Sequence, residues 1–349
     1  MHFSTKSAIK TAFFTQNIKD ICIIEKKVVT LSRNKYMKVM IGVCIVTYNQ
    51  EQYIAQAIDS VLMQVDCGHQ VVAYIGNDCS TDMTSEICHQ YAEKYPKQVV
   101  VIDNEKNLGL VGNTMNLLSI MRQDGCKYIA MLDGDDYWCD DHKLLKQMNY
   151  MNAHPEYGLV HTCIDLLYPH KYIADKRESV QEGDVSKVIF DFPIGNCSVV
   201  FKTELLNLID FKEFQQQGFM SVDFIMYIIF SCHTQFGFLL DHTAVWRRGH
   251  DSVSNTNDME KQIRYVHNSL AMWKYDAKLY PERWTADEKD LENYFHFRAF
   301  TIAFKYGDRK RALQEANLMG EGYRKKQKLK MLVAHSAILS ALWRRYKKV

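Results

Sequence analysis

Three carboxylates crowd into one short stretch of this chain, Tyr128-Ile-Ala-Met-Leu-Asp-Gly-Asp-Asp-Tyr-Trp138. Asp133, Asp135 and Asp136 follow an apolar run that we predict to be a buried strand. Carboxylates held this close repel one another and raise each other's pKa unless a cation lies among them. Because hard divalent cations prefer oxygen ligands and often bridge a carboxylate to a phosphate, the stretch predicts an Mg²⁺ or Mn²⁺ site. The alternative is an acidic loop that faces solvent and caps the next helix.

Two further apolar runs, 41–46 and 71–75, also end in polar residues. These residues are Thr47, Tyr48 and Asn49 after the first run and Asn77 and Asp78 after the second. We expect Asn49 to cap the helix that follows it. The carboxyl ends of parallel strands lie at one edge of a sheet, so all three polar clusters belong to one site. An aromatic ring for a base, a carboxylate for a nucleobase or ribose, and a metal ion for a diphosphate would together hold a nucleotide.

The spacing of apolar residues predicts the elements that position these clusters. The predicted strands span residues 41–46, 71–75, 99–102 and 128–132. Between them apolar residues recur at helical spacing, and strands that alternate with helices imply an α/β fold with a parallel sheet and right-handed crossovers. Neither G-x-G-x-x-G nor G-x-x-x-x-G-K-[ST] follows the first strand, which argues against a dinucleotide oxidoreductase and a P-loop protein.

Composition excludes several classes of protein. The 349 residues are 47% hydrophobic and 24% charged, as in an ordinary globular chain, and the net charge of +2 gives no electrostatic footprint for nucleic acid. The ten cysteines contain no C-x-x-C pair, and no group of histidines has metal-ligand spacing. This pattern argues against a zinc site and a disulfide framework, and favours a reducing, cytoplasmic compartment.

The ends of the chain differ from its middle. Residues 1–36 are basic and polar and precede Met37, which resembles a natural start. An upstream extension, a misplaced start codon and a functional arm all fit, and we expect this segment to be peripheral to the fold. No apolar stretch reaches the roughly 18 residues of a membrane-spanning helix, and the start lacks a signal peptide's apolar region.

Five spaced blocks carry a resemblance to a known family. They are Val46–Ile54, Ser60–Gln64, Asn77–Asp82, Asn107–Gly109 with Asn116, and Leu132–Asp136. Together, and in this order over residues 40–150, they resemble the family 2 glycosyltransferases of GT-A fold, which use nucleotide-sugar donors and invert the anomeric centre. The resemblance implies a mostly parallel, Rossmann-like sheet flanked by helices over residues 37–255. Its nucleotide-sugar half would span about 40–150 and its acceptor half about 151–255, and a helical region would follow over 256–349.

The resemblance also implies roles for the strand-end residues. Thr47, Tyr48 and Asp78 would line the nucleoside pocket together with Asn49. Asn77 is a weaker candidate for the same pocket, because it stands where the family usually has Asp. Asp133 would lie near the ribose and Asp135 would bind the metal. Asp136 would assist directly or through water.

Later motifs of the family are matched by Ser221–Phe224 and Val245–Ser254. Asp223 occupies the family's acidic position at a helix start, so the resemblance implies that it is the catalytic base. The alternative is a partner of the helix dipole, and Val222 stands where many members have Glu. Arg247, Arg248 and His250 are candidates for contact with the diphosphate or the metal, with His250 and one of the two arginines preferred.

Two further segments leave alternatives open. Asn196 and Ser198 follow a polar turn and are candidates either for acceptor contact or for a capping or turn role. Thr285-Ala-Asp-Glu288 has capping-box spacing before a helix that we expect to end at Gly307. Basic residues surround the apolar segment 331–343. This tail suits an anionic membrane surface or, equally, a packed helix with a solvated basic face.

The sequence therefore predicts a metal-dependent, inverting transfer of sugar from a UDP-sugar to a saccharide or lipid-linked saccharide acceptor. Cell-surface polysaccharide synthesis, in the cytoplasm or on the inner face of the membrane, follows by family analogy. A sugar nucleotidyltransferase is one alternative, but it would ordinarily carry a Gly-rich loop after the first strand, and Thr47–Glu51 contains no Gly. A catalytically inactive, saccharide-binding relative is the other.

Overall fold

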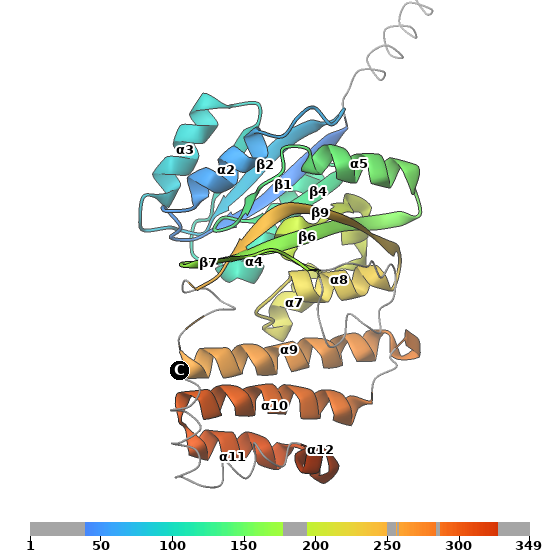
Figure 1. Ribbon diagram of the computed structural model, residues 1–349. Helices are drawn as coiled ribbons and strands as arrows, with labels where there is room; N and C mark the ends of the chain where they lie inside the picture. The colour runs from blue at the N-terminus through green and yellow to red at the C-terminus, as the bar shows by residue number, and fades with distance from the viewer. Residues whose placement is uncertain (1–38, 177–193, 250–255, 257, 284–286, 327–349) are drawn as a thin grey trace, which may run out of the picture. The chain divides into compact units, whose positions relative to one another are not determined.

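The computed structural model describes residues 39–176, 194–249, 256, 258–283 and 287–326 (Figure 1). The predicted extension 1–36, His250, Thr285 and the tail from residue 327 lie outside the described residues. The chain divides into a small unit, residues 1–39 with 68–70, and a large unit containing the rest. The fold and the site described below belong to the large unit.

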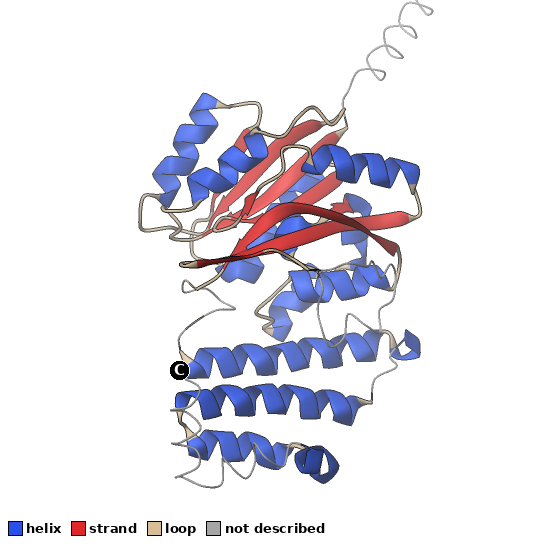
Figure 2. Ribbon diagram, in the orientation of Figure 1, coloured by secondary structure: helices blue, strands red, loops and turns tan. Residues whose placement is uncertain are grey.

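The first four strands confirm the predicted α/β pattern. They are β1 (Met40–Thr47), β2 (Gln70–Asn77), β3 (Val99–Asp103) and β4 (Tyr128–Asp133). They lie in the order β3-β2-β1-β4, with β2 parallel to β3 and β1 parallel to β4. The helices α2 (Ile54–Leu62), α3 (Thr84–Lys94) and α4 (Gly109–Gln123) connect them, and α5 (Lys143–Ala153) follows β4 (Figure 2).

The second half of the sheet is mixed. Its strands are β5 (Tyr137–Trp138), β6 (Tyr157–Tyr168), β7 (Lys171–Ile173), β8 (Val200–Lys202) and β9 (Gln235–Arg247). β8 is antiparallel to both β4 and β6, while β6 is parallel to β9. β5 is antiparallel to β9, so the strand that carries Arg247 lies beside the segment that follows the carboxylates.

Alternate residues of the central strands pack into two apolar layers, one on each face of the sheet. Ile41, Val43 and Ile45 of β1 pack on one face with α2 and α5. Cys44 and Val46 pack on the opposite face with α4 and with α8 (Asp223–Ser231). Because successive side chains of a strand point to opposite faces, β1 is buried on both sides, as its apolar sequence predicts.

The remaining helices come after β7 in sequence. Between β7 and β9 lie η1 (Asn196–Ser198), η2 (Thr203–Leu208), α7 (Phe211–Gln217) and α8. After β9 come α9 (Met259–Leu279), η3 (Pro281–Arg283), α10 (Glu288–Tyr306), α11 (Arg309–Leu318) and α12 (Glu321–Lys326). Ile228 of α8 shares an apolar core with α9, α10 and α11. None of the helices in the described part of the chain is long and apolar enough to cross a membrane.

Two predicted helix caps are wrong. Asn49 does not cap α2, which begins at Ile54 after Tyr53 without a side-chain cap. Asn49 instead adopts a left-handed backbone (φ 52°), and its Oδ1 accepts a hydrogen bond from Thr81 N at 2.7 Å. It thereby joins the loops that follow β1 and β2. The cap of α10 is Asp287, which accepts hydrogen bonds from the backbone N–H groups at the helix start, and the helix ends at Gly307 as predicted.

Candidate active site

The turn after β4 lies directly against the end of β1. Gly134 N donates a hydrogen bond to Val46 O at 2.9 Å. A Cβ atom at Gly134 would lie 2.4 Å from Gln50 Oε1 and 2.9 Å from Thr47 Cβ. Only glycine fits this close approach, so the spacing Asp133-Gly-Asp135 brings two carboxylates to the edge where β1 ends.

Like charge and burial act together on these carboxylates. Loss of hydration, repulsion from Asp135 and a smaller contribution from Asp223 raise the pKa of Asp133 to about 7. Burial, Asp135 and Asp133 raise the pKa of Asp136 well above its usual range. Crowded oxygen ligands with raised pKa values are suited to a hard divalent cation, which would relieve the repulsion. The side chains present offer the oxygen ligands that the predicted metal needs, and its binding here stays a prediction.

Arg247 closes the turn from the end of β9. Its backbone N–H donates to Asp136 Oδ1 at 2.9 Å, and its guanidinium donates to the carbonyl oxygen of Asp135. The guanidinium carbon lies 5.0 Å and 4.7 Å from the ring centres of Tyr53 and Tyr137. Arg247 thus fixes the backbone of residues 133–136, which we call the carboxylate turn.

Arg248 has different neighbours. Its guanidinium lies over the ring of Trp246 at 4.2 Å, and its backbone N–H donates to Leu167 O at 2.8 Å. The two adjacent arginines therefore have different surroundings, and Arg247 is the one that contacts the carboxylate turn. His250 is outside the described residues.

Asp78 is buried at the end of β2, where its carboxylate holds the start of α4. Oδ1 accepts hydrogen bonds from Leu108 N at 2.7 Å and from Asn104 Nδ2 at 2.9 Å. Oδ2 accepts from Gly109 N at 2.8 Å. Its backbone N–H donates to Thr47 O at 3.0 Å. Asp78 thus lies at the predicted edge and also has a structural role; that it binds a nucleoside stays a prediction.

The other predicted nucleoside residues differ in exposure. Asn77 is buried, and its Nδ2 donates to Asp103 Oδ1 at 2.7 Å. Thr47 is buried as well, and its hydroxyl donates to Gln50 Oε1 at 2.8 Å. Tyr48 is 48% exposed. Tyr48 therefore presents an aromatic ring that a base from solvent can reach.

Asn196 connects the carboxylate turn to α8. Its Nδ2 lies 3.1 Å and 3.0 Å from the two carboxylate oxygens of Asp133, and donates to them. Its Oδ1 accepts a hydrogen bond from the hydroxyl of Tyr227 at 2.7 Å. The sequence allows either an acceptor contact or a turn role for Asn196, and the structure shows it orienting Asp133. Ser198 instead donates to Gly195 O at 2.7 Å, as a turn residue does.

Asp223 is the first residue of α8, one helical turn before Tyr227. Burial raises its pKa, while hydrogen bonds from the Ser221 hydroxyl and from the backbone N–H of Phe224 lower it in part. Its repulsion of Asp133 shows that the two carboxyls lie in one electrostatic environment. The structure thus brings the candidate base to the same region as the carboxylate turn.

Sequence reasoning missed the contribution of α9 to this region. Burial and the charge of Asp223 raise the pKa of Tyr265 to about 12, against the opposing effects of Arg298, Ser221 and Arg248. Asn268, on the same helix, accepts from Met220 N at 2.8 Å and donates to Gly218 O at 3.1 Å. The only signal for these residues is their helical spacing on α9, because no local motif links them to Asp223.

Residues 42–170 match the family model described as glycosyl transferase family 2. This part of the chain is a family 2 glycosyltransferase domain. An uncharacterized protein of Mycobacterium tuberculosis is 40% identical to it over 111 residues, which cover 32% of this chain and 31% of that protein. The dTDP-rhamnosyl transferase RfbG of Shigella flexneri is 28% identical over 173 residues, which cover 48% of this chain and 56% of RfbG. The chain thus spans about a third to about a half of the length of these relatives.

A solved structure shares the fold. The crystal structure of S. aureus TarS residues 1–349 in complex with UDP-GlcNAc superposes with a TM-score of 0.50 at 14% identity. The match covers 82% of this chain and 92% of that chain. The predicted GT-A fold is confirmed.

Proposed function

We propose that this protein transfers a sugar from a nucleotide-sugar donor to a saccharide or lipid-linked saccharide acceptor, with inversion of the anomeric centre. The observation that carries the proposal is that Asp133 and Asp135, at the end of β4 and within the residues that match family 2, lie in one electrostatic environment with Asp223 of α8. The match to family 2 also favours sugar transfer over the alternative, a sugar nucleotidyltransferase.

The donor would bind at the edge formed by the ends of β1, β2 and β4. Tyr48 offers an exposed ring for the base, and the carboxylate turn would face the diphosphate. A UDP-sugar is the first donor to test. RfbG is named for transfer from dTDP-rhamnose, so a dTDP-sugar is the second.

A divalent cation, Mn²⁺ or Mg²⁺, would be held by Asp135 and Asp136, with Asp133 towards the ribose. When bound, it stabilises the negative charge that develops on the departing diphosphate. Arg247 holds the turn in shape through its backbone N–H and its guanidinium. Asn196 holds the carboxylate of Asp133 in place, and the hydroxyl of Tyr227 donates a hydrogen bond to Asn196.

Asp223 would take the proton of the acceptor hydroxyl. Inversion requires the hydroxyl to attack the anomeric carbon opposite the leaving diphosphate, and a hydroxyl is a poor nucleophile until a positioned base accepts its proton. The bond to the leaving nucleoside diphosphate breaks as the new glycosidic bond forms. The raised pKa of Asp223 makes it a better proton acceptor than an exposed aspartate.

The test is a transfer assay with a panel of nucleotide sugars, with and without Mn²⁺, in which the released nucleotide and the product are both measured. Glycosyl transfer releases a nucleoside diphosphate. A sugar nucleotidyltransferase would instead release a nucleoside triphosphate and a sugar 1-phosphate, and only when pyrophosphate is supplied. An inactive binder releases no nucleotide under either condition. The anomeric configuration of the product, measured by NMR, tests inversion. Asp135→Ala should abolish both transfer and its stimulation by the metal. Undiminished transfer in excess chelator would remove the metal from the mechanism.

We further propose cell-surface polysaccharide synthesis as the process and the cytoplasm, or the inner face of the membrane, as the setting. Both rest on the family resemblance. The basic tail that would contact a membrane falls almost entirely outside the described residues.

A further inference from the structure

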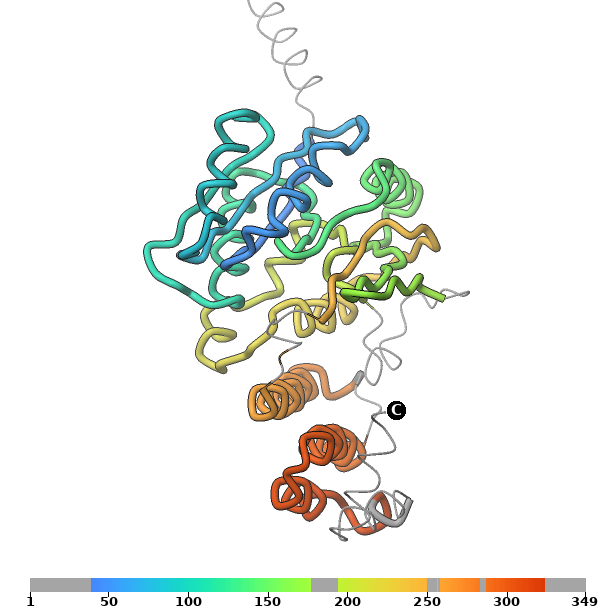
Figure 3. The backbone as a smooth tube through the Cα atoms, turned by 60° about the vertical axis from the view of Figure 1, so that its left-hand side comes forward, coloured from blue at the N-terminus to red at the C-terminus, as the bar shows by residue number. Residues whose placement is uncertain are grey.

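The three longest helices after β9 bring two imidazoles and a carboxylate together, away from the carboxylate turn. His267 lies on α9, His296 on α10 and Glu315 on α11, and Figures 1 and 3 show these helices side by side. Glu315 Oε2 lies 3.1 Å from His267 Nε2 and 2.9 Å from His296 Nδ1. One ligand atom from each residue lies within 4.8 Å of the other two.

The side chains of the cluster range from buried to partly exposed. The side chains of Glu315, His296 and His267 are 2%, 15% and 34% exposed. Glu315 lies beside Ala312 and Ala316, which belong to the apolar core of the three helices. A buried carboxylate next to an apolar core requires a cationic or hydrogen-bonding partner. An ion from solvent can reach the cluster at His267.

We propose that His267, His296 and Glu315 form a zinc-binding site that joins α9, α10 and α11. Two imidazole nitrogens and one carboxylate oxygen are a ligand set that Zn²⁺ favours, and they leave a fourth position for water. Bonds of about 2.0–2.1 Å in a tetrahedral arrangement separate ligand atoms by about 3.3 Å. The observed separations of 3.1 Å and 2.9 Å are close to this value, so small side-chain shifts would admit the ion.

The other carboxylate oxygen of Glu315 is already oriented. Arg311, one turn earlier on α11, places Nη2 3.2 Å from Glu315 Oε1. This ion pair leaves Oε2 directed at the two imidazoles. Partners of this kind, outside the ligand shell, fix the orientation of metal ligands and strengthen binding.

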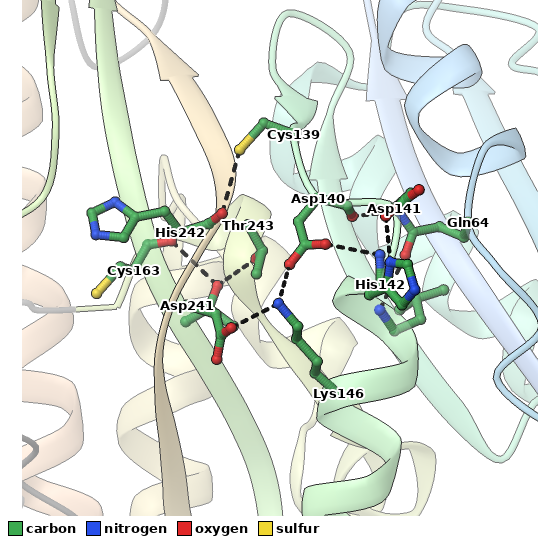
Figure 4. Close-up of polar contacts among 12 residues, drawn as sticks. Gln64, Cys139, Asp140, Asp141, His142, Lys146, Cys163, Asp241, His242 and Thr243 are labelled. Carbon is green, nitrogen blue, oxygen red and sulfur yellow. Dashed lines mark hydrogen bonds and ion pairs between the residues drawn. The ribbon is translucent and has the colours of Figure 1, made fainter.

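A second group in the described part of the chain, Asp140, Asp141 and His142, serves as a control. Figure 4 shows Lys146 pointing to both Asp140 and Asp241, with Nζ 2.7 Å from a carboxylate oxygen of each. Asp140 also accepts from His142 N at 2.9 Å. A cation already neutralises this group, and its His142 and Asp141 side chains are half exposed. We therefore expect it to bind Zn²⁺ weakly.

The experiment uses the full chain carrying Asp135→Ala, so that the proposed donor metal does not contribute. The chain is stripped with chelator and titrated with Zn²⁺ by calorimetry, and the visible spectrum of its Co²⁺ form is recorded. We expect one tight zinc per chain, a Co²⁺ spectrum without thiolate charge-transfer bands, and a higher Tm with Zn²⁺. Loss of a residue that only orients a metal ligand weakens metal affinity by about 10–100-fold. His267→Ala and His296→Ala each remove a ligand itself, so each should weaken zinc affinity by at least about 100-fold.

The controls decide between this site and the alternatives. His142→Ala should bind zinc as tightly as the parent. His267 is the most exposed of the three ligands, so His267→Ala should keep its circular dichroism spectrum even if His296→Ala unfolds. No zinc uptake by the parent, unchanged affinity in His267→Ala, or loss of binding in His142→Ala would each overturn the proposal and leave the cluster as an ion-pair network. Since the readout is zinc binding, failure here is separate from failure of the proposed glycosyl transfer.

Discussion

At the scale of single residues, the role proposed for Asp223 makes the most direct prediction. Asp223→Asn keeps the shape of the side chain and cannot accept a proton, so turnover should fall by about 10²-fold or more. Donor affinity should stay nearly unchanged, because the carboxylate turn, which we propose to face the donor, is intact. Steady-state kinetics and donor binding by calorimetry measure the two effects separately.

Asp290→Asn, the same substitution at an exposed position of α10, is the matched control and should turn over normally. If Asp223→Asn lost donor affinity in proportion to its rate, Asp223 would be a donor-site residue. Normal turnover would show that the base lies elsewhere.

Asp276 gives a prediction about stability. It is buried on α9, its Oδ1 has no hydrogen-bond partner among the described residues, and burial raises its pKa from 3.8 to about 7. Below pH 3.8 the carboxyl is protonated in both the folded and the unfolded chain. As pH rises from 3.8 to about 7 only the unfolded chain releases the proton, so the free energy of unfolding falls, by up to about 4 kcal/mol in total.

Urea unfolding of the parent and of Asp276→Asn at pH 4 and pH 8 tests this behaviour. The variant should lose less stability than the parent over this interval, because its amide does not titrate. Asp290→Asn should follow the parent. Equal losses in the parent and in Asp276→Asn would show that Asp276 does not titrate in this range.

The candidate site shows which residue roles a sequence can predict. The buried strand, Gly134 and the carboxylates are neighbours in sequence. The sequence alone therefore predicts that Asp133 and Asp135 lie where the strand ends. The contacts of Asn196 with Asp133, or of Asp78 with the start of α4, join segments far apart in sequence. The type of a polar residue does not indicate which distant residue it will contact. For this reason the sequence predicts that Asn49 caps the next helix, whereas it contacts Thr81.

At the scale of elements, the end of β1 and the turn after β4 depend on their close approach. Gly134→Ala places a Cβ 2.9 Å from Thr47 Cβ, and the two loops must separate. Overpacking of this kind typically costs about 1–3 kcal/mol. We expect a lower Tm and donor binding weakened by about 10-fold or more, measured by thermal unfolding and calorimetry.

Gly322→Ala on α12 is the matched control. A Cβ atom at Gly322 would have no atom of the described residues within 4 Å, so Tm should be unchanged or slightly higher. If Gly134→Ala behaved like Gly322→Ala in both measurements, the approach of the two loops would not matter to the site.

The helices after β9 show the limit of prediction for elements. Their apolar spacing and the C-terminal glycine of α10 predict that they form. Their partners are set by contacts across the chain, such as Phe224 of α8 against Trp273 of α9, with ring centres 4.8 Å apart. The same packing brings Tyr265 and Asn268 next to the segment that carries Asp223, and it assembles the proposed zinc site.

At the scale of the whole molecule, the region after β9 is structurally tied to the transferase domain. α8 contributes Asp223 to the candidate site and Ile228 to the core of the last helices. The domain boundary predicted near residue 255 stays a prediction. The shared core indicates that removing α9 to α11 would expose the apolar face of α8.

The tail is a separate matter, and it carries the last prediction. Residues 327–349 contain six lysines and arginines, no acidic residue, and the apolar segment 331–343. If this tail binds an anionic membrane, each basic residue near the surface contributes about 1 kcal/mol. A chain that ends at Lys326 should then dissociate from vesicles rich in phosphatidylglycerol while keeping its Tm and its transfer to a soluble acceptor.

Sedimentation with vesicles at low and high salt measures binding, and the full chain on neutral phosphatidylcholine vesicles is the control. Equal sedimentation of the full and shortened chains would favour the other interpretation, a tail packed on the protein with its basic face in solvent, and a lower Tm of the shortened chain would support that packing directly.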